Sequence, residues 1–217
     1  MTRRPGFDLS LYLVTDQGLC GERSLTDVVG LAVRGGVGLV QLREKRLGFR
    51  DMVALGRALK ALLASFGVPL LINDRVDVAL AVEADGVHLG QADMPVALAR
   101  QLLGSAAILG LSLERPEQLA EAEGLDVDYY GVSPVYTTPT KTDTGPGWGL
   151  DGLRTLRGAT SRPLVGIGGI GAHNAEAVIR AGADGVAVVS AICAAPDPEA
   201  ASRALLAAVR RELGPDH

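Results

Sequence analysis

Short apolar runs alternate along the chain with longer segments whose apolar positions recur at helical spacing. The apolar runs predict buried strands at residues 9–14, 38–42, 70–72, 86–89, 107–111, 128–132, 164–167 and 185–189. The amphipathic segments predict helices at residues 24–36, 49–66, 75–82, 96–103, 115–123, 150–157, 173–181 and 198–213. Each predicted strand is followed by a predicted helix, which is the pattern of a parallel α/β fold.

The number of these strand–helix units decides between a closed barrel and an open sheet. The chain has 217 residues, and the unit recurs eight times without a linker or a change in composition. Eight units fit a single (β/α)8 TIM barrel, whereas a flavodoxin-like open sheet usually has fewer strands. We therefore expect one TIM-barrel domain over residues 1–217, with residues 1–8 and 214–217 as loose termini.

Composition and charge narrow the class of protein. Aromatic residues make up 4% of the chain and there are 28 glycines, which is typical of parallel sheets with tight turns. The net charge of −4 predicts no nucleic-acid surface, and no apolar run is long enough to span a membrane. Cys20 and Cys193 have no motif spacing and are typical of reduced thiols. We expect a cytoplasmic protein without nucleic-acid or membrane partners, and the sequence leaves its oligomeric state open.

Polar side chains follow two neighbouring predicted strands at their carboxyl ends, where parallel α/β folds bind ligands. Asn73 and Asp74 follow one strand, and Asp93 lies in the loop after the next. Two carboxylates with an amide beside them suit Mg²⁺, which is usually shared with a phosphate. Asp74 alone could instead be the N-cap of the helix that follows it.

The stretch QLREK follows the second predicted strand. Gln41, Arg43 and Lys45 share one face of an extended chain, while Leu42 and Glu44 lie on the other face. Two cations and an amide at a barrel mouth predict an anion site, although the stretch on its own would also fit a solvated charge cluster. Beside the two aspartates, it favours a pyrophosphate bound with magnesium.

Two further loops carry polar groups. Ser112 ends the fifth predicted strand, and the loop at residues 133–149 contains the segment TPTK, with two hydroxyls and an ammonium group. An ordinary flexible loop is the alternative, but a connection of this length favours a functional lid. Lys141 of that segment would add a third cation to the diphosphate site.

The seventh and eighth predicted strands end in a different kind of sequence. Gly168, Gly169 and Ile170 expose backbone amides ahead of a helix, and Val189 and Ser190 precede a short apolar turn. Loops at these places in a TIM barrel often bind phosphate through backbone N–H groups, although a glycine pair could merely ease packing. A neutral site of this kind suits a phosphate monoester.

The histidines and candidate nucleophiles of the sequence do not form the patterns found in enzymes that use a covalent intermediate. His88 lies within a predicted strand and is expected to be a core residue or to support a residue of the site, rather than to act as the base of a nucleophile. His173 could cap a helix. There is no Cys–His or Ser–His–Asp arrangement. The expected chemistry is therefore departure of a metal-bound pyrophosphate with attack by a phosphorylated acceptor.

The motifs QLREK, NDRVDVALAVEADGVHLGQADMP, TPTK, GIGGI and ADGVAVVSAI, in this order, resemble those of the thiamine-phosphate synthase family from Leu11 to about Leu206. The resemblance implies a TIM-barrel transferase of thiamine biosynthesis. Such an enzyme joins 4-amino-2-methyl-5-(diphosphomethyl)pyrimidine to a thiazole phosphate, or its carboxylated form, and releases pyrophosphate. Its implied partners are thus small-molecule substrates, with Mg²⁺ as the cofactor.

The resemblance also implies a role for each site residue. The pyrimidine diphosphate would be bound by Gln41, Leu42, Arg43, Glu44, Lys45, Asn73, Ser112 and Lys141. Arg43, Lys45, Ser112 and Lys141 would be the catalytic residues. Magnesium would be held by Asp74 and Asp93. The thiazole phosphate would be bound by Thr138, Pro139, Thr140, Gly169, Val189 and Ser190.

Two residues of the loop at residues 133–149 depart from the pattern of the family. Ser133 and Thr137 stand where the family more often has glycine and proline, which changes the stiffness of the loop but not its ligands.

Two other functions are alternatives to the synthase. A thiazole tautomerase of the same fold uses a histidine for proton transfer, and the loops after the fifth and sixth predicted strands carry none. A ligand-sensing barrel would be expected to lose its metal ligands first, yet both aspartates are present.

Overall fold

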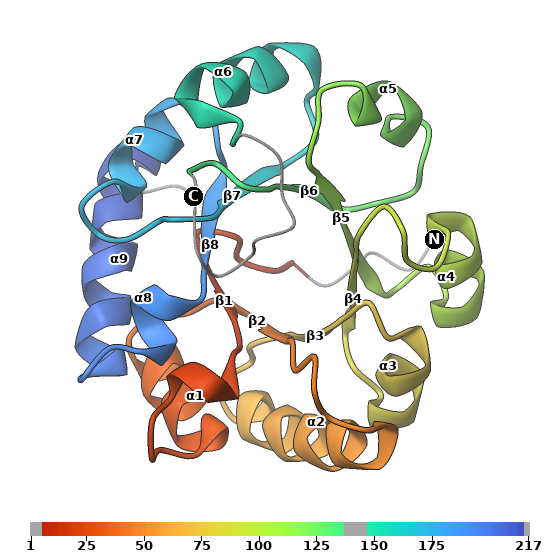
Figure 1. Ribbon diagram of the computed structural model, residues 1–217, viewed down its shortest axis with the longest axis vertical. Coiled ribbons are helices and arrows are strands. Elements are labelled where there is room, and N and C mark those ends of the chain that lie inside the picture. Colours follow the sequence, from red (N-terminus) through yellow and green to blue (C-terminus); the bar gives the residue numbers. More distant parts are fainter. Residues whose placement is uncertain (1–5, 137–146, 215–217) are drawn as a thin grey trace.

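The computed structural model describes residues 6–136 and 147–214. Its parallel strands close into a barrel in sequence order, because β8 pairs with β1 (Figure 1). This confirms the predicted TIM barrel and excludes the open sheet. The strands are β1 (Leu11–Val14), β2 (Leu39–Leu42), β3 (Leu70–Asn73), β4 (Gly86–Leu89), β5 (Ile108–Leu113), β6 (Tyr129–Val132), β7 (Leu164–Ile167) and β8 (Gly185–Val188).

Helices surround the barrel on the outside, as Figure 1 shows. Side chains fix where several of them begin: Ser24 accepts a hydrogen bond from the Asp27 amide, and Asp197 accepts one from the Ala200 amide. The short helix after β8 was not predicted. The helices are η1 (Gln17–Leu19), α1 (Leu25–Arg34), α2 (Phe49–Ala64), α3 (Val76–Val82), α4 (Val96–Leu103), α5 (Gln118–Ala122), α6 (Gly149–Ala159), α7 (Ala175–Arg180), α8 (Ser190–Cys193) and α9 (Pro198–Leu213).

The barrel strands are buried on both faces. Successive side chains of a strand lie on opposite faces. One side chain therefore points outward, into the layer between strands and helices, and the next points into the barrel. Leu13 and Tyr130 belong to the outer layer, between strands and helices. The inner layer contains Tyr12, Val14, Leu39, Leu71, Ile108, Tyr129, Val165 and Ala187.

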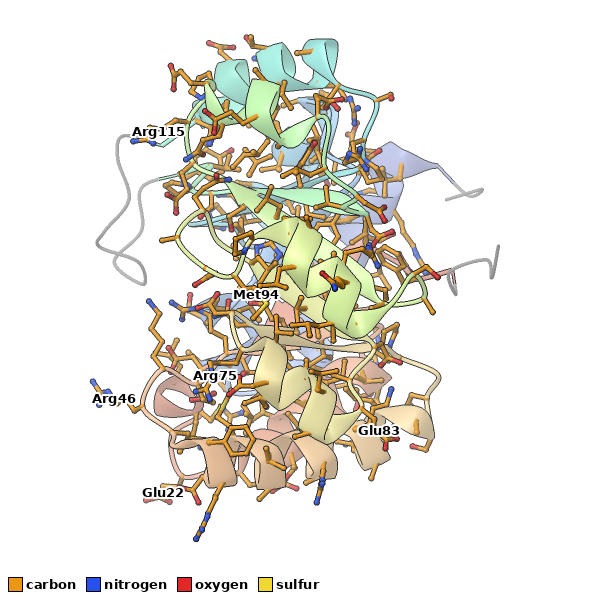
Figure 2. The ribbon with its side chains drawn as sticks, turned by 90° about the vertical axis from the view of Figure 1, so that its right-hand side faces the viewer. Glu22, Arg46, Arg75, Glu83, Met94 and Arg115 are labelled. Atoms are coloured by element: carbon orange, nitrogen blue, oxygen red, sulfur yellow. The ribbon has the colours of Figure 1, made fainter. Side chains whose placement is uncertain are left out.

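The two ends of the barrel differ in the connections that they carry. In Figure 2, Arg46, Arg75, Met94 and Arg115 come from loops that follow strands and lie toward one end, while Glu83 lies toward the other. The first end is formed by the carboxyl ends of the strands, where a TIM barrel has its active site. Within the described residues, no helix is both long and apolar enough to cross a membrane.

The start of the described chain packs against the amino-terminal side of the barrel. The ring of Phe7 meets the ring of Tyr129 edge to face, with 6.4 Å between centroids. Asp8 accepts a hydrogen bond from the Ser10 amide at 2.8 Å. Phe7 and Asp8, which we expected in a loose terminus, therefore make defined contacts. Residues 1–5 and 215–217 of the expected loose termini lie outside the described residues.

Candidate active site

A cavity of about 900 Å³ opens at the carboxyl ends of the strands. Most of the site residues predicted from the sequence line it, although they come from β2, β3, β4, β5, β7 and β8 or the loops that follow them. These lining residues are Gln41, Arg43, Lys45, Asn73, Asp74, Asp93, Ser112, Gly169, Val189 and Ser190. The predicted residues Thr138, Pro139, Thr140 and Lys141 lie outside the described residues, as does the rest of segment 137–146.

The QLREK stretch divides between two faces, as its alternation predicted. Gln41, Arg43 and Lys45 line the cavity. Leu42 is fully buried in the outer core layer. Glu44 turns toward β1, where it accepts hydrogen bonds from the Gln17 amide at 2.9 Å and the Thr15 hydroxyl at 3.2 Å. The side chains of Leu42 and Glu44 do not line this cavity, so any contact of theirs with a ligand there would involve backbone atoms.

Asp74 is held in an unusual backbone conformation at the end of β3. Its φ angle is 62°, in the left-handed region that few residues other than glycine adopt. Its amide donates to the His88 carbonyl at 2.9 Å, which continues the pairing of β3 with β4. Arg75, rather than Asp74, is the N-cap of α3, so the capping alternative for Asp74 was wrong. Such backbone strain at a cavity is typical of a functional position.

The carboxyl groups of Asp74 and Asp93 meet at the edge of the cavity. The pKa of Asp74 is raised to about 6, mainly by burial and then by the hydrogen bond and negative charge of Asp93, against smaller opposing effects of Asn73 and Arg43. Asp93 is fixed by the Gly90 amide, which donates to its Oδ2 at 2.6 Å. Two carboxyl groups in contact require a shared proton or a cation between them.

This carboxylate pair fits magnesium better than a transition metal. Among the described residues, no group of three or more His, Cys, Asp or Glu side chains could form a metal centre on its own. Magnesium commonly takes only one or two carboxylates and completes its shell with water and substrate phosphate oxygens. The oxygen-only pair of Asp74 and Asp93 suits that mode of binding.

The wall formed by β7 and β8 is chemically different. Gly168 and Gly169 both have positive φ angles, 105° and 63°, which glycine adopts without strain. Asn174 holds the loop: its Oδ1 accepts from the Gly171 amide at 2.8 Å and its Nδ2 donates to the Gly169 carbonyl at 2.9 Å. The described lining residues of this wall include no Lys, Arg, Asp or Glu. Apart from the His173 imidazole, the wall is therefore neutral, with backbone groups as its main polar atoms.

Both histidines that the sequence singled out line the cavity. His173 precedes α7, but the N-cap of that helix is Asn174, so the capping role suggested for His173 was wrong. His88 does support another residue, as expected, because its Nε2 lies 2.8 Å from the Ser112 hydroxyl. Ser112 itself lies within β5 and not after it, because β5 continues to Leu113.

Two tyrosines beneath the cavity were not predicted from the sequence. The hydroxyl groups of Tyr12 and Tyr129 lie 3.0 Å apart inside the barrel. Tyr129 also contacts His88 Nδ1 at 2.9 Å. A tyrosine or histidine within a buried strand requires a hydrogen-bond partner. That requirement was the available signal, but the sequence does not show which strands would supply the partners.

Comparisons with known sequences show which proteins this chain resembles. The family model described as "Thiamine monophosphate synthase" matches residues 11–192. A thiamine-phosphate synthase from Albidiferax ferrireducens is 62% identical over 190 residues, which cover 88% of this chain and 87% of the relative. A thiamine-phosphate synthase from Xanthobacter autotrophicus is 57% identical over 203 residues, which cover 94% of this chain and 96% of the relative.

Comparisons with solved structures give the same picture. Thiamine phosphate pyrophosphorylase from Pyrococcus furiosus matches with a TM-score of 0.87 and 38% identity, covering 95% of this chain and 98% of that one. A 3-hexulose-6-phosphate synthase matches with a TM-score of 0.67 and 19% identity, covering 92% of this chain and 99% of that one. The second match shows a likeness of fold alone.

Proposed function

The chain belongs to the thiamine monophosphate synthase family, and we propose that it joins 4-amino-2-methyl-5-(diphosphomethyl)pyrimidine to a thiazole phosphate or its carboxylated form. The products are thiamine monophosphate and pyrophosphate, so the enzyme is a transferase. One observation carries the assignment of both substrates to this cavity. Its β2–β4 wall has cationic and carboxylate side chains, whereas its β7–β8 wall is neutral and built from backbone.

The charged wall suits the pyrimidine diphosphate. Arg43 and Lys45 would donate charge-assisted hydrogen bonds to the diphosphate oxygens, beside the Asn73 amide. Asp74 and Asp93 would hold Mg²⁺, and their contact supports this because it places two negative charges where a divalent cation is required. When bound there, magnesium would neutralise part of the charge on the leaving group.

The neutral wall suits the thiazole phosphate. Backbone N–H groups of Gly169 and Ser190 would donate to the phosphate monoester, because glycine lets a ligand approach the backbone closely. The apolar side chains of Ile167 and Val188 also line this wall and would contact the thiazole ring. The acceptor would therefore be held beside the diphosphate site without competing for its cations.

The arrangement favours a dissociative substitution. The bond from the pyrimidine methylene carbon to the pyrophosphate oxygen breaks, and its electron pair leaves with pyrophosphate. The remaining positive charge spreads into the aminopyrimidine ring, and the thiazole nitrogen then donates its lone pair to the methylene carbon. Arg43, Lys45, Ser112 and Lys141 would stabilise the negative charge that grows on the leaving group. The two walls would hold the nitrogen close to that carbon.

Cellular location is also part of the proposal. Cys20 and Cys193 are buried free thiols. Burial raises the pKa of both thiols, that of Cys193 to about 12. The two thiols are neighbours, because a hydrogen bond joins their side chains. Two neighbouring thiols that stay unpaired support a reducing compartment, and we place the enzyme in the cytoplasm.

A pyrophosphate-release assay tests the proposed function. The enzyme is given both substrates with magnesium, and then each substrate or magnesium is omitted in turn. We expect pyrophosphate only when both substrates and magnesium are present. Release without the thiazole phosphate would indicate a hydrolase, and isomerisation of a thiazole without release would indicate a tautomerase. Full turnover in the presence of a chelator would reject the role given to Asp74 and Asp93.

A further inference from the structure

Hydrogen bonds cross the floor of the cavity from one side of the barrel to the other. Gln41 Nε2 donates to the Tyr12 hydroxyl, which lies 3.0 Å from the Tyr129 hydroxyl. Tyr129 contacts His88 Nδ1 at 2.9 Å, and His88 Nε2 contacts the Ser112 hydroxyl at 2.8 Å. We refer to these five residues as the floor network. Both of its ends, Gln41 and Ser112, belong to the proposed diphosphate site.

The neighbouring strands leave room for the floor network. A Cβ atom on Gly110 of β5 would lie 2.5 Å from His88 Nδ1 and 2.4 Å from the Tyr129 hydroxyl. A Cβ atom on Gly131 of β6 would lie 2.9 Å from His88 Cε1. Any larger residue at either position would displace the imidazole ring. The position of His88 is therefore fixed by packing as well as by hydrogen bonds.

The donors and acceptors of the floor network can be ordered by counting protons. Burial raises the pKa of both tyrosine hydroxyls, so each keeps its single proton. Gln41 Nε2 can only donate, so the Tyr12 oxygen accepts the hydrogen bond from Gln41. The Tyr12 hydroxyl then donates its own proton to the Tyr129 oxygen. Tyr129 then donates to His88 Nδ1. A neutral imidazole that accepts at Nδ1 carries its proton on Nε2, and it donates that proton to Ser112.

The opposite order is less favourable. If Ser112 donated to His88, each later bond would reverse, and the Tyr12 oxygen would accept from both Gln41 and Tyr129. Its own O–H group would then have no acceptor among the hydrogen bonds of the described residues. Tyr12 is only 1% exposed, and a buried donor without a partner is costly. In the order that begins at Gln41, both tyrosine hydroxyls donate and accept, and both ring nitrogens of His88 have a partner.

We propose that His88 is a positioning residue that makes Ser112 a hydrogen-bond donor to the leaving diphosphate. Because Ser112 accepts from His88 Nε2–H, its own proton is free to point into the cavity. A diphosphate anion only accepts hydrogen bonds, so Ser112 in the opposite order would present lone pairs to a negative charge. This inference rests on the proposed function, since it concerns the leaving group of that reaction.

Nitrogen NMR of the free protein tests the order of the floor network without any turnover. Histidine labelled with ¹⁵N distinguishes the two neutral tautomers, and the signals of His88 are identified by their loss in His88→Gln. We expect the Nε2–H tautomer in the unmodified protein and a population of the Nδ1–H tautomer in Tyr129→Phe, which lacks the donor to Nδ1. An Nδ1–H or doubly protonated His88 in the unmodified protein, or an unchanged tautomer in Tyr129→Phe, would overturn the proposal.

Kinetics test what the order does for catalysis. Tyr129→Phe should lower kcat for pyrophosphate release by about tenfold or more, with the KM for the pyrimidine diphosphate changed less than about threefold, because the Ser112 bond strengthens as charge develops. His88→Gln should keep more of kcat than His88→Leu, since its amide can still donate to Ser112. An unchanged kcat in Tyr129→Phe would refute the positioning role.

The neighbouring tyrosine provides a matched control. Tyr130 precedes Gly131 on β6 but belongs to the outer layer, where the Arg162 guanidinium lies 5.5 Å from its ring centroid. Tyr130→Phe should keep kcat and the His88 tautomer, and an equal loss in both variants would mean that the effect is structural. Melting temperatures confirm that each variant is folded. An unmodified enzyme without turnover would refute the proposed function, whereas the tautomer measurement would still test the floor network.

Discussion

Replacing Asp74 by asparagine should stabilise the metal-free protein at neutral pH, although it removes a proposed magnesium ligand. The pKa of Asp74 is raised from 3.8 to about 6 by burial and by Asp93. A difference of this size corresponds to about 3 kcal/mol for a fully buried group. Asp74 is only half-buried, and solvent screening reduces the expected gain in unfolding free energy to about 1–2 kcal/mol. Asparagine keeps the shape and tolerates a positive φ angle.

The pH dependence of this gain has a definite sign. Folded Asp74 binds its proton more tightly than unfolded Asp74, so acid favours the folded state. This contribution is fully present below pH 3.8 and is lost as the pH rises through about 6. The asparagine variant has no such loss. Its advantage over the unmodified protein should therefore develop between these two pH values and stay constant above them.

Urea unfolding in the presence of a chelator, at several pH values from acid to neutral, measures this difference. Asp77→Asn is the matched control, because a hydrogen bond from Arg75 lowers the pKa of Asp77 and its loss should not stabilise the protein. Added magnesium should stabilise the unmodified protein and Asp77→Asn but not Asp74→Asn. A less stable Asp74→Asn at neutral pH without metal, or an equal response of all three proteins to magnesium, would refute the reasoning.

Three further predictions concern the reaction itself. Lys141 lies outside the described residues, and the substitution Lys141→Ala should lower kcat by about 10²-fold. An unchanged kcat with a raised KM would mean that Lys141 only binds substrate. Asn174→Ala frees the Gly169 carbonyl and should raise the KM for the thiazole phosphate by about tenfold, with little change for the pyrimidine diphosphate. Ser24→Ala, which removes a helix cap elsewhere, should change neither KM. An electron-withdrawing substituent on the pyrimidine should slow single-turnover chemistry by orders of magnitude, and a rate that barely responds would indicate direct displacement by the thiazole.

Elements with clear sequence signals at their ends were predicted to the residue. Helix α4 follows Pro95 and ends before Gly104, and α9 begins at Pro198 and ends before Gly214. Proline marks a helix start because the N–H group that it lacks has no partner within the helix there, and glycine marks a helix end because it adopts the backbone conformation that terminates a helix. The helix α8 was missed because four residues are too few to show a helical period.

The site was predictable at the ends of strands and not inside them. Polar residues such as Asp74 and Arg43 stand out where an apolar run stops. Tyr12 and Tyr129 do not, because barrel strands are buried on both faces and their sequence lacks the alternation that would show which face is inside. Ser112 was placed after its strand because the apolar run stops before it, yet pairing with β6 extends β5 to Leu113.

Calorimetry on two variants tests the central claim that one cavity has two separate anion sites. Gly169 has a positive φ angle of 63°, and Gly169→Val would place a side chain where the phosphate of the acceptor approaches the backbone. Asp93→Asn would instead remove one carboxylate from the other wall. We predict that Gly169→Val weakens binding of the thiazole phosphate far more than that of the pyrimidine diphosphate with magnesium, and that Asp93→Asn does the reverse. If either variant weakened both ligands alike, the assignment of two separate sites would be contradicted.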